Sequence, residues 1–283
     1  MLVNKEIKVI RELLNLTQKR LADELGVSVD SIIRRENGTD EIEETKLELI
    51  YKLAHKKGIF FNKIYEQILF EECQKNKLLL LFHGSKKHIT FPLDLLHSKE
   101  KNDFGIGFYL GDNFEQSAVY ISNCLSNDIY AFSLNTSKLK IIKFSCDTEW
   151  MIAIAYYRGW LSKYENHQIV KAIIEKIENS DIVIAPIADN RMFDLISEFV
   201  DGFITNEQCE HALAATNLGY QYVVRTNNAL KKLKFIKLFY LSNVEKTEFI
   251  LKKDENNDIS YNKVRLARIE YRNKGKYIEE LLK

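Results

Sequence analysis

Apolar side chains recur at helical spacing at the start of the chain and predict three short helices. The first has its apolar face at Ile7, Ile10, Leu13 and Leu14. The next two are expected to begin after hydroxyl-bearing caps and to end at glycine turns, at Thr17, Gly26, Ser28 and Asn37-Gly38. Two short helices joined by a tight turn, residues 25–28, form the helix-turn-helix pattern.

The helical pattern continues from Leu47 to Gln74, with an interruption at Gly58, and then gives way to short apolar runs. These runs predict strands at Leu78–Phe82, Phe108–Leu110, Ile129–Leu134, Leu139–Phe144, Asp181–Ala185, Tyr222–Arg225 and Phe235–Leu241. The segments between them predict helices at Asn113–Cys124, Glu149–Trp160, Glu165–Asn179, Arg191–Glu198 and Asn206–Leu213. Strands outnumber these helices at irregular spacing, which favours a mixed α+β sheet over a βαβ repeat.

We therefore expect an α+β protein in which an N-terminal all-α domain precedes a mixed α+β domain. The predicted limits are 1–72 for the helix-turn-helix domain and its connecting helix, 73–241 for the α+β domain and 242–283 for a C-terminal extension. The extension is expected to hold a polar turn at 254–258 and then a basic helix. The basic side chains form either a solvated helix face or a surface that binds nucleic acid or phosphate.

Composition narrows the classes of protein. The chain has 283 residues, of which 46% are hydrophobic, so two domains can each bury a core. Lys and Arg (41) nearly balance Asp and Glu (40), so binding to nucleic acid or anionic lipid must come from local patches. No apolar run reaches the roughly 18 residues of a membrane span, and the N-terminus runs into a charged amphipathic helix.

The four cysteines, Cys73, Cys124, Cys146 and Cys209, lack the close spacing of a zinc site. A chain of this size with a real core does not need disulfides either. We therefore expect reduced thiols, no metal, no membrane and a cytoplasmic location.

The N-terminal segment resembles the phage-repressor (Xre-type) family over residues 4–58. The resemblance is carried by residues 11–13, 16–18, 21–22, 25–28 and 35–38. It implies that the third helix enters the major groove of DNA, with base or phosphate contacts from Ser28, Asp30, Ser31, Arg34 and Arg35 and a backbone contact from Gln18. Acidic and basic residues are equal in number over residues 1–58, which argues for weak DNA binding or for contact with a partner protein instead. A homodimer is also left open.

Four later segments resemble the ADP-ribosyltransferase superfamily, in the branch with an H-Y-E signature. They are His83–Ser85, Phe104–Tyr109, Ser117–Tyr120 and Tyr220–Val224. Their order is also similar to that of a bacterial group of uncharacterised transferase-like domains, DUF3990, which would account for Asp181–Asp189 as well. The resemblance covers roughly residues 77–236 and implies two packed, mainly antiparallel sheets and NAD as substrate.

A site for NAD needs backbone groups for the carboxamide, aromatic faces for the nicotinamide ring and a polar group for the ribose. By resemblance, His83 would bond a ribose hydroxyl, Gly84 would hold the carboxamide through its backbone, and Ser117 would add a third bond to it. Tyr109 and Tyr120 would sandwich the ring. Ser85, Phe104 and Gly107 complete the expected NAD-binding set. Each residue alone is more often structural; their order and joint spacing support the NAD-binding interpretation.

The third signature position departs from the family, because Gln221 stands where the family has Glu. A carboxylate would stabilise the cationic sugar as nicotinamide leaves, whereas an amide keeps a hydrogen bond without the charge. Asp189 is the first candidate for a substitute carboxylate, although it could equally cap a helix, and Glu149 is the second.

The sequence thus supports an NAD-dependent mono-ADP-ribosyltransferase acting on a protein or nucleic acid, in the role of a toxin or defence effector. His83, Tyr109, Gln221 and Asp189 are its candidate catalytic residues. The alternative is a transcriptional regulator whose catalytically silent transferase-like domain senses NAD or ADP-ribose. A third interpretation is an interaction module with neither activity.

Overall fold

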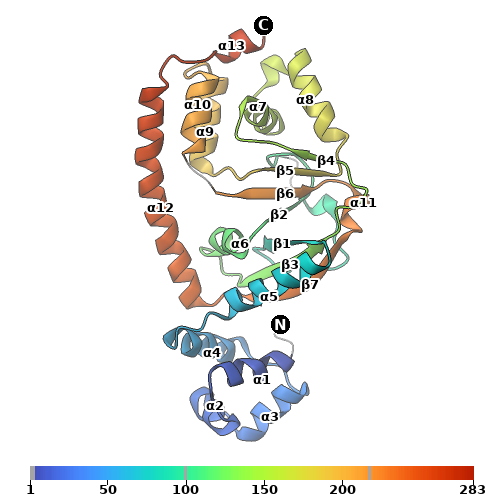
Figure 1. Ribbon diagram of the computed structural model, residues 1–283, viewed down its shortest axis with the longest axis vertical. Helices are drawn as coiled ribbons and strands as arrows, with labels where there is room; N and C mark the ends of the chain where they lie inside the picture. Colours follow the sequence, from blue (N-terminus) through green and yellow to red (C-terminus); the bar gives the residue numbers. More distant parts are fainter. Residues whose placement is uncertain (1–3, 99–100, 216–217) are drawn as a thin grey trace. The chain divides into compact units, whose positions relative to one another are not determined.

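The computed structural model describes residues 4–98, 101–215 and 218–283, which form two compact units (Figure 1). The first unit takes residues up to 88, 113–133 and 235–251; the second takes 89–112, 134–234 and 252–283. Each unit therefore draws on segments that are far apart in the sequence.

Five helices open the first unit: α1 (Asn4–Leu13), α2 (Gln18–Leu25), α3 (Val29–Asn37), α4 (Glu44–Lys56) and α5 (Phe61–Lys75). The Thr17 hydroxyl accepts from the Arg20 backbone N–H, and the Ser28 hydroxyl accepts from that of Ser31, so both predicted caps are confirmed. Gly26 ends α2 in the left-handed conformation, which glycine adopts without steric cost. The helix-turn-helix pattern is confirmed in α2 and α3.

An ion pair ties the first three helices together. Arg11 Nε donates to Glu36 Oε1 at 2.6 Å, and Gln18 Nε2 donates to Glu36 Oε2 at 2.8 Å. The Glu36 side chain is only 5% exposed. Its burial raises the pKa, but the hydrogen bonds from Arg11 and Gln18 outweigh that effect and hold the pKa below its usual value. The Glu36 side chain is therefore an ionised carboxylate in the folded protein at neutral pH.

The rest of the first unit comprises β1 (Leu79–Gly84), α6 (Phe114–Ile121), β3 (Asp128–Leu134) and the larger part of β7 (Leu233–Tyr240). The strands are neighbours in the order β1-β3-β7. Phe82, Phe114 and Phe239 pack with ring centroids 5.3 to 6.0 Å apart, within the range of favourable aromatic contacts. This aromatic cluster fixes α6 against the strands.

The second unit holds the strands β2 (Phe108–Gly111), β4 (Ile141–Lys143), β5 (Ile182–Pro186) and β6 (Tyr220–Val224), in the order β4-β5-β6-β2. The β4–β5 pair is parallel, and the β5–β6 and β6–β2 pairs are antiparallel. Its helices are α7 (Thr148–Tyr157), α8 (Gln168–Glu178), α9 (Asn190–Val200), α10 (Asn206–Ala214), α11 (Asn227–Leu230) and α13 (Ile278–Leu281), with 3₁₀ turns at Leu95–His97 and Ser162–Tyr164. Residues 150–155 of α7 are all buried, as expected of a helix enclosed by its core.

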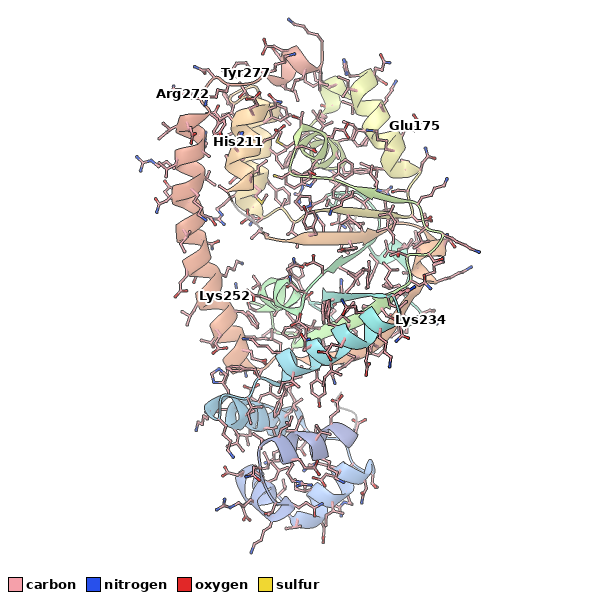
Figure 2. The ribbon with its side chains drawn as sticks, in the orientation of Figure 1. Glu175, His211, Lys234, Lys252, Arg272 and Tyr277 are labelled. Carbon is pink, nitrogen blue, oxygen red and sulfur yellow. The ribbon has the colours of Figure 1, made fainter. Side chains whose placement is uncertain are left out.

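The last long helix, α12 (Asn243–Glu270), corrects the prediction of a polar turn at 254–258, since this segment lies within the helix. Asp and Asn have low helix propensity, whereas Glu favours a helix, and low propensity does not end a helix that tertiary contacts hold. In the second unit Arg268 Nη2 pairs with Glu198 at 2.6 Å. Just beyond α12 the Tyr271 ring stacks on that of His211, which is labelled on α10 in Figure 2, with ring centroids 3.5 Å apart. These contacts support the C-terminal half of α12.

The predicted α+β class and the N-terminal helical region are confirmed. The described strands belong to a mixed seven-stranded sheet, where resemblance implies two packed sheets. Strand ends shift by up to two residues: β1 extends through Gly84 and β6 begins at Tyr220. Of the helices that the structure describes, none combines the length and apolarity needed to cross a membrane. The predicted domain limits stay predictions.

We expect Glu36→Gln to lower the free energy of unfolding by about 2 kcal/mol at pH 7, because it leaves the Arg11 guanidinium without its counter-charge. The native pKa of Glu36 lies below the unfolded value, so this contribution is present above the ordinary carboxyl pKa and is lost as the pH falls through the native one. Urea unfolding of the full chain at pH 7 and at acid pH measures both effects.

Glu12→Gln is the matched control, since its carboxylate lies 3.8 Å from Arg11 and is 56% exposed. It should change stability by less than about 0.5 kcal/mol. A stability difference between wild type and Glu36→Gln that does not shrink in acid would contradict the assignment.

Candidate functional site

The predicted DNA-contacting residues of the first unit differ in availability. Asp30 and Arg34 on α3 and the capping residue Ser28 are exposed, whereas Arg35 is only 7% exposed and donates to the Glu41 carbonyl oxygen at 3.3 Å. Arg35 is therefore committed to the fold of the domain. The exposed Arg34 pairs with Asp40 at 2.9 Å, which offsets its charge.

Two more residues that were predicted to contact DNA are less available for it. The Gln18 amide is held by Glu36, and Ser31 is half-buried. The exposed face of α3 thus presents few uncompensated positive charges, consistent with the balanced charge of this segment. Any strong affinity for DNA would have to draw on other parts of the chain.

Gly84 ends β1 at a point where no side chain fits. A Cβ at this position would lie 2.5 Å from the Ser117 carbonyl oxygen and 3.0 Å from Ile121 Cγ2. The strand thereby approaches α6 closely, and Ser117 is 6% exposed. The structure brings together Gly84 and Ser117, the two residues expected to hold a carboxamide, although this packing alone suffices to require glycine.

The other candidates of the first unit are more open. His83 is half-buried at the end of β1, and Tyr120 is 61% exposed with the Lys86 ammonium 5.3 Å from its ring centroid. The Ser85 hydroxyl donates to the Lys87 carbonyl oxygen at 2.5 Å. Ser85 is therefore engaged in its own loop, whereas the Tyr120 ring has a face accessible to solvent.

In the second unit the glycine loop, residues 103–107, leads into β2 and is held by its neighbours. Tyr109 Oη accepts from the Phe104 backbone N–H at 3.1 Å and donates to the Gly105 carbonyl oxygen at 2.8 Å. Arg225 donates to the Phe104 carbonyl oxygen. Gly105 has a φ of 71°, and a Cβ on Gly107 would lie 2.6 Å from Val223 Cγ1.

Tyr109 is consequently a support for this loop as well as a candidate ring contact. Burial raises the pKa of its hydroxyl well above the ordinary value, so it stays protonated and donates. The Phe104 ring is fully buried and stacks on Phe144 with centroids 5.8 Å apart. Phe104 belongs to the core of the unit.

Gln221, which the sequence resemblance aligns with the third signature residue, contacts a carboxylate. Its Nε2 donates to Asp103 Oδ2 at 3.1 Å and to the Pro186 carbonyl oxygen at 3.2 Å. Asp103 Oδ1 accepts from Arg158 Nη2 at 2.7 Å. The Arg158 guanidinium lies 3.4 Å from the Phe193 ring centroid, so both ends of this ion pair are fixed.

The two carboxylates that the sequence singles out are occupied elsewhere. Asp189 caps α9 through the Met192 backbone N–H at 3.0 Å and pairs with Arg191 at 3.0 Å. Glu149 is half-exposed and pairs with Lys176 at 3.2 Å. The capping alternative for Asp189 is thus the one that the structure contains.

Sequence reasoning missed Asp103, Arg158 and Arg225. Asp103 opens the glycine loop and Arg225 directly follows β6, so their positions beside recognised segments were a usable signal. Arg158 sits at the end of a buried helix and gave no such signal. Within the described ranges, no group of three or more His, Cys, Asp or Glu is placed to hold a metal ion.

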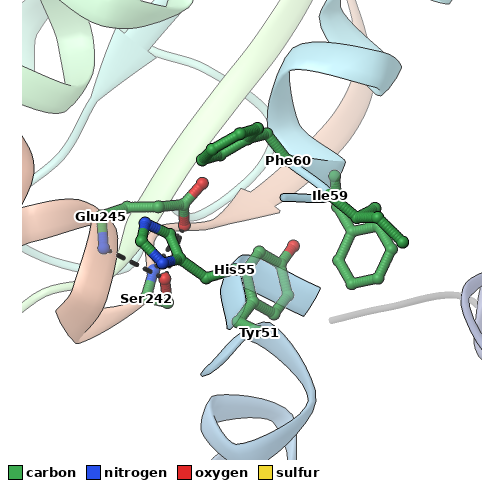
Figure 3. Close-up of a pocket in the computed structure, with 7 residues that line it drawn as sticks. Tyr51, His55, Ile59, Phe60, Ser242 and Glu245 are labelled. Atoms are coloured by element: carbon green, nitrogen blue, oxygen red, sulfur yellow. Dashed lines mark hydrogen bonds between the residues drawn. The ribbon is translucent and has the colours of Figure 1, made fainter. Parts of the chain in front are cut away.

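A pocket in the first unit lies where α4, α5 and the start of α12 meet. It is lined by Tyr51, His55, Ile59, Phe60, Phe61, Ser242 and Glu245 (Figure 3). The Glu245 carboxylate accepts from the Ser242 hydroxyl at 2.7 Å and from Asn62 Nδ2 at 3.0 Å. Because these polar groups form hydrogen bonds with one another, they link α5 to the start of α12 within the unit.

Comparison with known families gives two matches. The model described as "Protein of unknown function (DUF3990)" matches residues 79–235, and the model described as "Helix-turn-helix" matches residues 7–56. The chain therefore carries a helix-turn-helix domain of the Xre type at residues 7–56, which suggests a DNA-binding regulator. Comparison with curated proteins and with solved structures produced no match.

We expect Gly84→Ala to lower the free energy of unfolding by about 1 to 3 kcal/mol, because the new Cβ must displace the backbone of α6 at Ser117. Thermal unfolding of the purified variant tests this. Ser85→Ala serves as the control, since it removes only a local hydrogen bond in the next residue. Equal melting temperatures for the two variants would rule out the close approach.

Proposed function

Since this chain belongs to the DUF3990 family, whose description assigns no activity, we propose its function from its residues: an NAD-dependent mono-ADP-ribosyltransferase that modifies a macromolecular acceptor. The observation that carries the proposal is the antiparallel pairing of β2 with β6, which sets Gly111 opposite Gln221 and Tyr109 opposite Val223. The strand with the second signature residue thus lies beside the strand with the third.

Further support comes from the first unit. His83 lies half-buried near the end of β1, and the next residue, Gly84, brings the strand backbone close to Ser117 of α6. In the proposed reaction His83 bonds a ribose hydroxyl, Gly84 and Ser117 bind the carboxamide, and Tyr109 and Tyr120 contact the nicotinamide ring. Ribose, amide and aromatic ring each receive the kind of group that recognises them.

The acceptor is proposed to be a protein or a nucleic acid that the helix-turn-helix domain brings near the transferase domain. A toxin or defence effector is the biological role that such an activity would fit. The products are mono-ADP-ribosylated acceptor and free nicotinamide.

A second candidate function is a regulator whose transferase-like domain binds NAD or ADP-ribose without turnover. One observation in its favour is Gln221, which lacks the charge of the glutamate in the H-Y-E signature of the ADP-ribosyltransferases. The other is the match to the helix-turn-helix family. Purified protein incubated with labelled NAD and cell lysate separates the two candidates. Nicotinamide release with labelled product supports the enzyme, whereas calorimetric NAD binding without release supports the sensor.

We expect His83→Ala to weaken NAD binding about tenfold, because a net hydrogen bond to the ribose contributes about 1.5 kcal/mol. Isothermal calorimetry measures the affinity, and chromatography of released nicotinamide measures turnover. His88→Ala is the matched control, five positions along the chain and 72% exposed. A folded His83→Ala protein with unchanged affinity and turnover would refute the site.

For the helix-turn-helix domain we expect binding to the protein's own promoter that weakens with salt, with Arg34→Ala reducing both the affinity and the salt slope, the latter by about 1. Arg34→Lys is the control that keeps the charge. Gel shifts at several salt concentrations measure these effects. An affinity that Arg34→Ala leaves unchanged would exclude α3 as the contacting helix and favour a partner-binding role.

A further inference from the structure

We propose that Asp103 supplies the carboxylate that the H-Y-E signature of the ADP-ribosyltransferases would place at position 221. Gln221 is then the positioning residue that holds Asp103. The inference rests on the proposed function. Its basis is the hydrogen bond from Gln221 Nε2 to Asp103 Oδ2 at 3.1 Å. The Asp103 side chain is 13% exposed. In this proposal the carboxylate comes from the loop that leads into β2 and not from β6.

The charge is needed for one step. The bond between C1′ of the ribose and the nicotinamide nitrogen breaks, and its electron pair leaves with the nicotinamide, which becomes neutral. The cationic character passes to C1′ and the ring oxygen of the sugar. A nucleophilic oxygen or nitrogen of the acceptor then bonds to C1′ and loses its proton to water. A fixed carboxylate beside the ribose stabilises the cationic sugar between these events.

Asp103 is fixed in the way that this role requires. Arg158 Nη2 binds Oδ1 at 2.7 Å, and Gln221 binds Oδ2. The next residue, Phe104, has its backbone N–H bonded to Tyr109 Oη and its carbonyl oxygen bonded to Arg225. A carboxylate whose position is set before the reaction needs no reorganisation when charge develops.

The carboxylate also keeps capacity for a ligand. Each carboxylate oxygen can accept two hydrogen bonds, and Oδ2 accepts one from Gln221. A ribose hydroxyl could occupy the second. Of the three carboxylates considered as substitutes, Asp103 contacts Gln221, whereas Asp189 bonds Arg191 and Glu149 bonds Lys176.

The same contact explains why glutamine suits position 221 in this chain. A glutamate there would place a second carboxylate about 3 Å from Asp103, and two like charges at this distance cannot both ionise without a large cost. The amide removes that repulsion and donates a hydrogen bond instead. An aspartate at 103 is compatible with an amide at 221, and an asparagine at 103 would be compatible with a glutamate.

The first test is Asp103→Asn in the full chain. It keeps the size of the side chain and removes the charge, so nicotinamide release should fall about 100-fold to 1000-fold in kcat, as for other single electrostatic groups. The calorimetric affinity for NAD should change less than about threefold, because the proposed charge acts on the transition state. Because Asp103 also pairs with Arg158, the melting temperature is expected to fall in either case, whereas a merely structural role would reduce the affinity for NAD along with turnover.

The second test relocates the charge. Gln221→Glu alone should lower turnover and the melting temperature, the latter by about 3 °C, because it opposes two carboxylates. The double variant Asp103→Asn with Gln221→Glu restores one carboxylate and one amide at the contact. It should be more active than either single variant, and this comparison stands even if Asp103→Asn alone fails to fold.

Wild-type turnover together with an equally active Asp103→Asn variant would overturn the role of Asp103 while leaving the proposed function intact. A Gln221→Glu variant more active than wild type would also overturn it, since the charge would then belong on the strand. If wild type releases no nicotinamide from NAD, the proposed function itself fails and the inference falls with it.

Discussion

The ion pair between Asp103 and Arg158 is the constraint on which the glycine loop of the second unit depends. It joins the loop to the end of α7, and Gln221 joins the same carboxylate to β6. A half-buried charge is tolerated only when its partner and its remaining hydrogen bonds are present. The ion pair therefore anchors the start of the loop, while Tyr109 and Arg225 hold its middle and the pairing with β6 holds β2.

The helical part of the fold was predictable because its signals are local. Caps at Thr17 and Ser28 and the left-handed glycine at Gly26 depend on neighbours within four residues, and all three occur where expected. Strand existence was also predictable from apolar runs. The ends of the strands were not, because pairing decides them: β6 begins at Tyr220 since that residue pairs with Pro186.

The errors have a common cause, which is that contacts between distant segments leave little trace in the sequence. The segment 254–258 reads as a turn by composition, yet α12 runs through it. Asp103 and Gln221 are 118 positions apart, so the sequence gives no sign that the structure places this aspartate beside the glutamine. Asp189 illustrates the opposite case. Its local sequence context predicted a helix cap as one alternative, and the structure contains that cap at the start of α9.

Hydrogen bonds of polar side chains connect the helix-turn-helix domain with the rest of the first unit. The Glu48 carboxylate accepts from the Tyr240 hydroxyl at 2.9 Å and from the Asn243 backbone N–H at 3.0 Å, and His55 lies 2.6 Å from Glu248. Asn62 reaches the Tyr240 carbonyl oxygen and the Glu245 carboxylate.

These bonds connect α4 and α5 with the end of β7 and the start of α12. Burial raises the pKa of Glu245, so a buried carboxylate lies in the middle of the network and depends on Ser242 and Asn62 for its hydrogen bonds. Loss of either partner would leave the buried carboxylate with fewer hydrogen bonds, at a cost in stability. The helices α4 and α5 are thus joined to β7 and α12 by defined side-chain hydrogen bonds and not by the chain connection alone.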